Sequence, residues 1–180
     1  ENCRFESMLD DATNIHGIYM RVDSVLTPTT FLAKFGHFQQ EGARFADVGD
    51  TLRFIDRTTL RPVGLGNLLS IDKSSRDCYR IETDFDLSAV ENPGRIAVEN
   101  ITRGASAVIR NCIVRYNRAR SLLISTPGDV LIENCDFSSM MAGIRICGDA
   151  NYWFEAGNTR NVVVRGNKFS DLGIGGHNPQ

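Results

Sequence analysis

The residues best suited to chemistry in this sequence are two adjacent acids, Asp10 and Asp11, in a polar segment that also contains Asn14 and His16. Two carboxylates can cleave a glycosidic bond, because one protonates the leaving oxygen while the other activates water or attacks the sugar carbon. The same pattern also fits acids that only accept hydrogen bonds from turn amides, with His16 as a surface residue. We treat Asp10 and Asp11 as candidate catalytic residues, and Asn14 and His16 as candidate substrate contacts.

A second candidate is the loop at 149–158, which contains three consecutive aromatic residues, Tyr152, Trp153 and Phe154, followed by Glu155. Aromatic faces stack on the apolar faces of sugars, so these rings could line a binding cleft. The alternative is that the rings hold the loop against the rest of the fold. We assign Trp153 and Glu155 as further candidate substrate contacts.

A third set of polar residues is basic: Arg115, Arg118 and Arg120 lie close together in the sequence. Arginine side chains in such a group can bind a carboxylate or a phosphate through paired hydrogen bonds. A solvated turn that carries three charges explains the same pattern.

These candidate residues lie in or beside the units of an internal repeat. An aliphatic run, an Asn-containing turn and an aromatic or β-branched residue recur along the chain. Such units supply short strands, and because no single unit can bury its apolar face, the units must stack. The spacing of two between apolar residues favours strands over helices. We therefore predict an all-β fold, a right-handed parallel β-helix or solenoid with an inserted small β-barrel-like module. The aligned segments are 1–5, 110–114, 133–137 and 165–169.

The alignment predicts that Phe5, Val114, Phe137 and Phe169 occupy equivalent positions in successive units. It also places Cys3, Cys112 and Cys135 at one repeat position, which predicts a stack of interior thiols. The five cysteines include no C-x-x-C pair, so a zinc site is poorly supported and we expect no metal.

The repeat is interrupted between about Asp23 and Asn92. Five strand-like segments separated by turn residues predict a small barrel or sandwich in this interval. We therefore expect two domains: residues 1–22 and 93–180 as incomplete parallel β-helix coils, and 23–92 as the inserted module. The five segments are 31–38, 43–46, 51–55, 68–71 and 78–82.

The composition is that of an ordinary globular protein, with 42% hydrophobic and 23% charged residues. A net charge of −2 gives no reason to expect nucleic acid or an anionic membrane as a partner. No apolar run approaches the roughly 20 residues that a membrane span needs. The chain begins inside a repeat and without Met, so we expect a fragment. The sequence does not indicate whether the protein forms oligomers.

Several of these segments together resemble one enzyme family. The run Asn2-Cys3-Arg4-Phe5, followed by Asp10-Asp11-Ala12-Thr13-Asn14-Ile15-His16-Gly17, is similar to the exo-α-1,3-galactosidases of glycoside hydrolase family 110. The segments 148–155 and 161–167 resemble later coils of that family, and the stretch from Phe45 through 49–56 resembles its inserted β-barrel.

The resemblance implies an inverting hydrolase that removes terminal α-1,3-linked galactose, as on blood-group B type glycans, without a metal or organic cofactor. Asp10 would be the general acid, and Asp11 would belong to the general-base side. The family pattern places a further catalytic Asp about one coil upstream, so the fragment alone is expected to lack part of the active site. Family members are typically exported, which implies an extracellular or periplasmic location.

Two other classes of function fit a stacked-strand fold. A polysaccharide lyase or polygalacturonase-like hydrolase is one; a lyase would use acid-bound Ca²⁺ and a basic residue, which the acidic turn lacks. A non-catalytic glycan-binding or structural protein is the other. It predicts no enlarged acidic turn, whereas the turn that carries Asp10 and Asp11 is longer than the matching turns after Val114 and Phe137. Calcium dependence and turnover of glycans distinguish these alternatives from the glycosidase.

Overall fold

The computed structural model describes residues 1–175, which form sixteen β-strands and three short 3₁₀ helices. The described chain divides into two compact units. Unit 1 contains Glu1–His16, Ala105–Cys147 and the described part of Asn158–Gln180, and unit 2 contains Gly17–Gly104 and Gly148–Gly157. No helix within residues 1–175 is long and apolar enough to span a bilayer.

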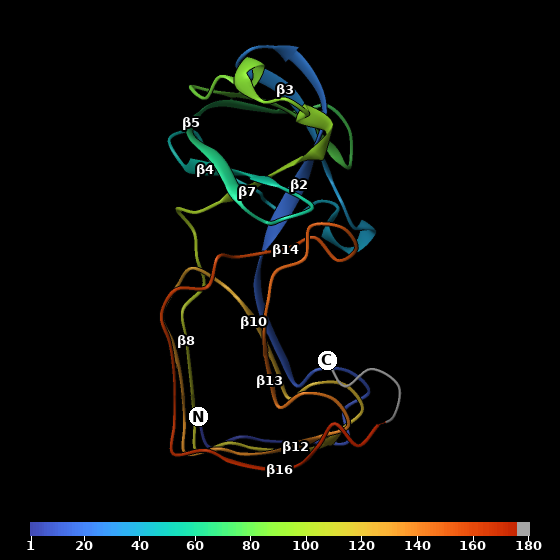
Figure 1. Ribbon diagram of the computed structural model, residues 1–180, viewed down its shortest axis with the longest axis vertical. Coiled ribbons are helices and arrows are strands. Elements are labelled where there is room, and N and C mark those ends of the chain that lie inside the picture. Colours follow the sequence, from blue (N-terminus) through green and yellow to red (C-terminus); the bar gives the residue numbers. More distant parts are fainter. Residues whose placement is uncertain (176–180) are drawn as a thin grey trace. The chain divides into compact units, whose positions relative to one another are not determined.

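Unit 2 is built on a closed antiparallel barrel of six strands (Figure 1). The strands pair in the order β2-β3-β6-β5-β4-β7, and β7 pairs back with β2 to close the sheet. Because the sheet is closed, every barrel strand is hydrogen-bonded to a neighbour on both sides and no sheet edge is left unpaired. The bounds are β2 (Thr13–Thr27), β3 (Thr30–Phe35), β4 (Thr51–Asp56), β5 (Pro62–Lys73), β6 (Cys78–Thr83) and β7 (Ile96–Asn100).

The 3₁₀ helices lie in the barrel's connections. They are η1 (Phe38–Gln40), η2 (Leu87–Ala89) and η3 (Pro93–Arg95). The predicted strand at 43–46 does not form; Phe45 and Ala46 are instead buried as loop residues against the barrel core. Burial of an apolar pair therefore does not require a strand here.

The barrel has apolar contacts on both faces of its wall, because side chains alternate between the two faces along each strand. Met20, Phe31 and Phe54 are fully buried in one cluster. Their sequence neighbours Tyr19 and Ile55 belong to a different cluster, together with apolar residues of the 148–157 segment. The short strand β14 (Glu155–Ala156) ties that segment to the wall by antiparallel pairing with Ile18 and Gly17 of β2.

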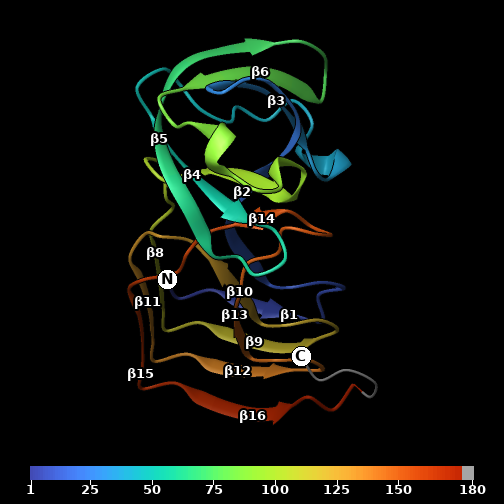
Figure 2. The same cartoon turned by 45° about the horizontal axis from the view of Figure 1, so that its top comes forward.

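Unit 1 contains three parallel sheets of short strands, which Figure 2 shows from a second angle. Within each sheet, segments from successive parts of the sequence lie side by side. One sheet has the order β1-β9-β12-β16, the second β15-β11-β8, and in the third β10 pairs with β13 and with the first residues of β2. The bounds are β1 (Arg4–Glu6), β8 (Ala107–Arg110), β9 (Ile113–Asn117), β10 (Leu122–Ser125), β11 (Val130–Glu133), β12 (Asp136–Ser139), β13 (Ile144–Ile146), β15 (Val162–Arg165) and β16 (Lys168–Leu172).

The register of the first sheet confirms the sequence alignment of four anchor residues. Phe5 pairs with Val114, Val114 with Phe137, and Phe137 with Phe169. The rings of Phe137 and Phe169 stack with centroids 5.3 Å apart. Like residues therefore lie next to like across strands, as cross-strand packing favours.

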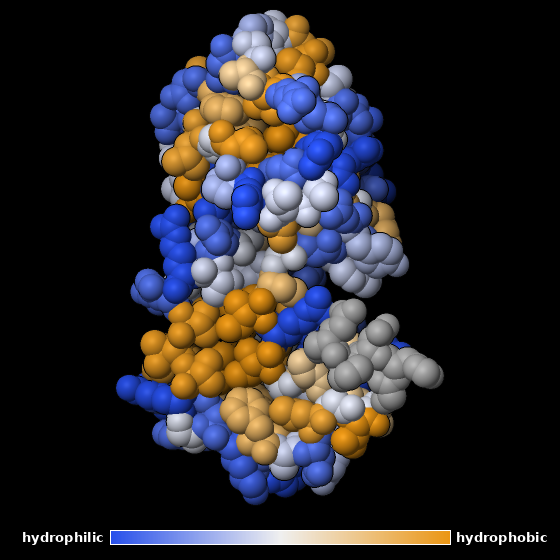
Figure 3. All heavy atoms as spheres, in the orientation of Figure 1, coloured by the Kyte–Doolittle hydropathy of each residue, from blue (hydrophilic) through white to orange (hydrophobic). Residues whose placement is uncertain are grey.

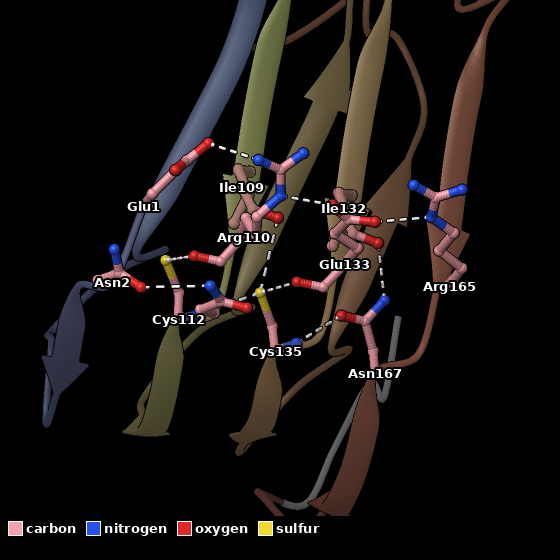
Figure 4. A network of polar contacts seen from close by, with 11 residues as sticks. Glu1, Asn2, Ile109, Arg110, Cys112, Ile132, Glu133, Cys135, Arg165 and Asn167 are labelled. Atoms are coloured by element: carbon pink, nitrogen blue, oxygen red, sulfur yellow. Dashed lines mark hydrogen bonds and ion pairs between the residues drawn. The ribbon is translucent and has the colours of Figure 1, made fainter.

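Oppositely charged side chains alternate across the residues that precede the turns into this sheet (Figure 4). Arg110 donates to Glu1 at 3.2 Å and also binds Glu133, and Arg165 donates to Glu133 at 2.6 Å. Opposite charges at neighbouring positions favour this register, because a slip along the strands would move each charge away from its partner.

The next residue in each unit adopts a left-handed backbone conformation. Asn2, Asn111 and Asn134 have φ near 55°, and Gly166 has φ 64° at the aligned position. Asparagine and glycine are the residues that tolerate this conformation best. A Cβ at Gly166 would lie 2.5 Å from Asn134 Oδ1, so the fourth unit has glycine where its neighbour's amide is close.

The aligned thiols differ in burial. Cys112 and Cys135 are buried next to each other, and the amide of Cys112 donates to the Cys135 sulfur at 3.3 Å. Burial raises the pKa of the Cys135 thiol. Cys3 is exposed, so the predicted interior position holds for two of the three thiols. The hydrogen-bonded, apolar surroundings of Cys112 and Cys135 fit a packing role for these two thiols.

Part of unit 1 presents apolar side chains to solvent, and Figure 3 shows them gathered over the parallel strands. The exposed apolar residues of β13, β15 and β16 are Ile146, Val163, Val164, Phe169 and Leu172.

The predicted fold class, a right-handed parallel β-helix with an inserted barrel-like module, is wrong. The chain is all-β, as predicted, but its architecture is a closed six-stranded antiparallel barrel with additional sheets. The prediction relied too much on the repeated short strands. The strands of the parallel sheets are five residues long or shorter, apart from β2, which both units share, whereas the longest barrel strand has 15 residues. The predicted domain boundaries at 22/23 and 92/93 stay predictions, and residues 176–180 of the second segment lie outside the described residues.

Candidate functional site

The two candidate acids lie in the irregular segment between β1 and β2, and their surroundings differ. The Asp11 side chain is 7% exposed and accepts three hydrogen bonds from Arg120: Nε and the backbone N–H donate to Oδ1 at 2.8 and 2.9 Å, and Nη2 donates to Oδ2 at 2.9 Å. Asp10 is exposed, and its Oδ1 accepts the backbone N–H of Asp11 at 2.9 Å. One carboxylate is thus held rigidly by the fold, and the other faces solvent.

The turn that carries the acids is fixed by the turn that follows β9. The amide of Arg118 donates to Met8 O at 2.9 Å, and its Nε donates to Leu9 O at 2.6 Å. The amide of Met8 in turn donates to the buried Asn117 Oδ1 at 3.2 Å. These contacts satisfy backbone groups that a turn would otherwise leave unpaired. They hold the segment on either side of Leu9, whose own side chain is 79% exposed.

The three arginines of the predicted basic set each contact this chain. Arg115 pairs with Asp136, Arg118 binds the Leu9 carbonyl, and Arg120 binds Asp11. The hypothesis that they bind an external carboxylate or phosphate is therefore not supported, and a freely solvated turn does not describe Arg120 either. A bidentate guanidinium–carboxylate pair is among the strongest and most directional polar contacts in proteins.

Asn14 and His16 lie at the start of β2, where the strand pairs in parallel with β10. Asn14 is in register with Leu123, and His16 with Ser125. Ile15, between them, packs against the buried cluster of unit 1. Because side chains alternate along a strand, Asn14 and His16 share the face opposite to that cluster. The sequence-based assignment of these residues to substrate binding stays a prediction.

The three consecutive rings of the aromatic loop differ in burial. Phe154 is buried with Tyr19 and Ile55, and a Cβ at Gly36 would lie 2.0 Å from its ring, so glycine at 36 is needed for the ring to fit. Tyr152 and Trp153 are 69% and 48% exposed. The alternative that the rings hold the loop against the rest of the fold is therefore correct for Phe154, but not for Tyr152 and Trp153.

The residues that fix this loop were not found from the sequence. Asp149 accepts the backbone N–H groups of Asn151, Tyr152 and Trp153, the last at 2.5 Å. The Gln40 side-chain amide donates to the carbonyl of Trp153 at 2.9 Å and to that of Phe154 at 3.1 Å. Glutamine at 40 carries no recognisable signal, because its partners lie more than 100 residues away in the sequence.

The structure brings Asp10 and Asp11 together with Arg120 in unit 1, which also contains Asn14 and His16. Trp153 and Glu155 belong to unit 2. Arg120 was recognised only as one of several basic residues, since Asp11 lies 109 residues from it in the sequence. Among the residues that the structure describes, no three His, Cys, Asp or Glu side chains are grouped as metal ligands.

Comparisons of the sequence with known proteins match one family model and several proteins named as galactosidases. Residues 30–94 match the model of the family described as GLAA-B beta-barrel domain II. The chain is 39% identical over 169 residues to a protein named alpha-1,3-galactosidase B from Bacteroides thetaiotaomicron, covering 94% of this chain and 27% of that protein. Proteins of the same name from Parabacteroides distasonis and Akkermansia muciniphila are 32% and 37% identical, and the chain again aligns over 94% of its length. The chain thus spans between 21% and 29% of the length of these three relatives.

Proposed function

We propose that this chain is part of a glycoside hydrolase that removes terminal α-1,3-linked galactose from glycans with inversion of configuration. The observation that carries the proposal is the alignment of 94% of the chain with proteins named alpha-1,3-galactosidase. The aligned part includes the GLAA-B barrel match at residues 30–94. The same proposal includes an extracellular or periplasmic location, because glycans of this kind are displayed outside cells.

Within this proposal, Asp10 is the general acid and Asp11 belongs to the general-base side. The different surroundings of two adjacent carboxyl groups support the division, since an acid and a base need distinct environments. The exposed Asp10 is free to approach a leaving oxygen, whereas Arg120 fixes the orientation of Asp11. An inverting reaction requires acid and base about 6.5–9.5 Å apart, with room for a water between the base and the sugar.

The proposed substrate contacts are Asn14, His16, Trp153 and Glu155. Side-chain amides, imidazoles and carboxylates hydrogen-bond sugar hydroxyl groups, and an exposed indole stacks on a sugar ring. Two carboxylates supply the proton transfers of hydrolysis, so the proposal requires neither a metal nor an organic cofactor.

The test uses the full-length protein and a disaccharide with terminal α-1,3-galactose. We expect Asp10→Asn and Asp11→Asn each to lower kcat by about 10²–10⁴-fold, the range for loss of general acid–base catalysis. Asp136→Asn is a matched control, because Asp136 is also paired with an arginine but lies on β12. Its turnover should stay close to that of the parent protein.

Product stereochemistry gives an independent check. If the reaction inverts, NMR of the first product must show β-galactose before mutarotation. Initial release of α-galactose contradicts inversion, and near-normal turnover by either Asn variant removes that residue from the mechanism.

A further inference from the structure

Four aromatic side chains of unit 2 lie against one another at its surface, and we call them the aromatic surface: His37, Phe38, Tyr152 and Trp153. The His37 ring lies 4.9 Å from that of Trp153 and 4.6 Å from that of Phe38, and the Tyr152 ring lies 5.0 Å from that of Trp153. Phe38 is 71% exposed, more than either Tyr152 or Trp153. The rings come from two segments more than 100 residues apart in the sequence.

The aromatic surface is held in place from both segments. Gln40, which is buried, joins them by donating to the carbonyls of Trp153 and Phe154. The Phe154 ring is seated over Gly36, directly before His37. Asp149 accepts the amides of the loop. The exposed rings therefore sit on a fixed backbone, which lowers the entropy lost when they bind a ligand.

The edges of these rings carry hydrogen-bonding groups. His37 Nδ1 accepts the amide of Gln39 at 3.4 Å, so in the neutral ring Nε2 carries the proton and is the donor. Tyr152 adds a phenolic hydroxyl, and Trp153 an indole N–H. Flat apolar faces with polar edges match a pyranose, which has C–H groups on its faces and hydroxyl groups around its rim.

We propose that the aromatic surface is a carbohydrate-binding surface on which a galactose-containing glycan stacks. Galactose suits it because its axial 4-hydroxyl leaves C–H groups at positions 3, 4 and 5 together on one face. Adjacent large exposed rings, as opposed to single exposed apolar residues, mark an interaction site. The choice of a glycan as the ligand rests on the proposed function, and it extends that function from Trp153 to His37, Phe38 and Tyr152.

Binding is measured apart from catalysis by isothermal titration of the full-length protein. The probe is an oligosaccharide that ends in α-galactosyl-1,3-galactose, and the protein carries Asp10→Asn to suppress turnover. Losing one stacked ring should weaken binding about tenfold. We expect this loss for Trp153→Ala and Tyr152→Ala, and retention of most affinity for Trp153→Phe. Leu69→Ala is the matched control, because Leu69 is 51% exposed in the same unit but outside the aromatic surface.

The outcomes separate this inference from the proposed function. Unchanged affinity in both alanine variants, with Asp10→Asn inactive, overturns the carbohydrate surface and removes Trp153 from the proposed substrate contacts, but it leaves the glycosidase activity. Weaker glycan binding in both alanine variants, in a protein that hydrolyses no α-1,3-galactoside, supports the surface and overturns the glycosidase. Loss of affinity in Leu69→Ala equal to that in Trp153→Ala contradicts a specific role for the rings.

Discussion

Replacing Arg120 by alanine tests whether the acidic turn is held by a single ion pair. The change removes two of the three hydrogen bonds to Asp11 and leaves only the backbone N–H at 2.9 Å. Breaking a buried pair typically costs about 3–5 kcal/mol, because the remaining charge is left uncompensated. The Asp11 side chain is 7% exposed and that of Arg120 19%, so water can reach part of the vacated space. We therefore expect the lower end, about 3 kcal/mol.

This loss should be local, and hydrogen exchange measured by mass spectrometry can detect it in the full-length protein. A local cost of about 3 kcal/mol corresponds to roughly 100-fold faster amide exchange. We expect it in peptides that cover residues 8–16 and 117–125. Arg4→Ala is the control, because Arg4 and Glu6 form an exposed pair, which contributes at most about 1 kcal/mol.

If exchange in those peptides rises less than about threefold in Arg120→Ala, then the backbone contacts of Met8 and Leu9 hold the turn, and not the ion pair. A double-mutant cycle adds a second check, since Asp11→Asn should cost little once Arg120 is absent.

Phe154→Ala should destabilise unit 2 by about 3–5 kcal/mol, as deletion of a buried aromatic ring does, whereas Trp153→Ala should change its stability by less than about 1 kcal/mol. Hydrogen exchange over residues 148–157 measures both, and equal effects would contradict the division of roles in the loop. Hydrogen bonds from Arg165 and, to a lesser extent, Arg110 hold the pKa of Glu133 below its usual range. The ionised Glu133 therefore stabilises the fold above the pKa of about 4.3 that it has in the unfolded chain, and this contribution is lost as the pH falls through the pKa of the folded state. The difference in thermal midpoint between the parent protein and Glu133→Gln should therefore shrink below about pH 4, and a pH-independent difference would refute this.

Several local features were predictable because they depend on nearby residues alone. The Asn-containing turns require a residue that tolerates positive φ, and the strands that follow them pair in the predicted register, from Phe5 to Phe169. In the barrel, the predicted strand at 78–82 is β6 and that at 51–55 is β4, each within one residue. Alternation of apolar and polar residues identifies such strands without reference to their partners.

The architecture, in contrast to the all-β class, was not predictable in the same way. A repeat signal shows which strands are alike, but closure of β2 with β7 depends on pairing between segments far apart in the sequence. The long strand β2 also contributes residues to both units, so the pattern of its first residues gives no sign of the barrel pairing that follows.

The all-β class, the register of the parallel strands and the presence of two adjacent acids in a polar turn follow from the sequence. The residues that hold the candidate site in place become visible only in the folded protein. Folding gave Asp11 an arginine partner 109 residues away, buried one of three consecutive aromatic rings, and placed His37 beside Trp153. Backbone conformation and the alternation of side chains are set by the local sequence, whereas burial and ion pairing arise only when distant segments are packed together.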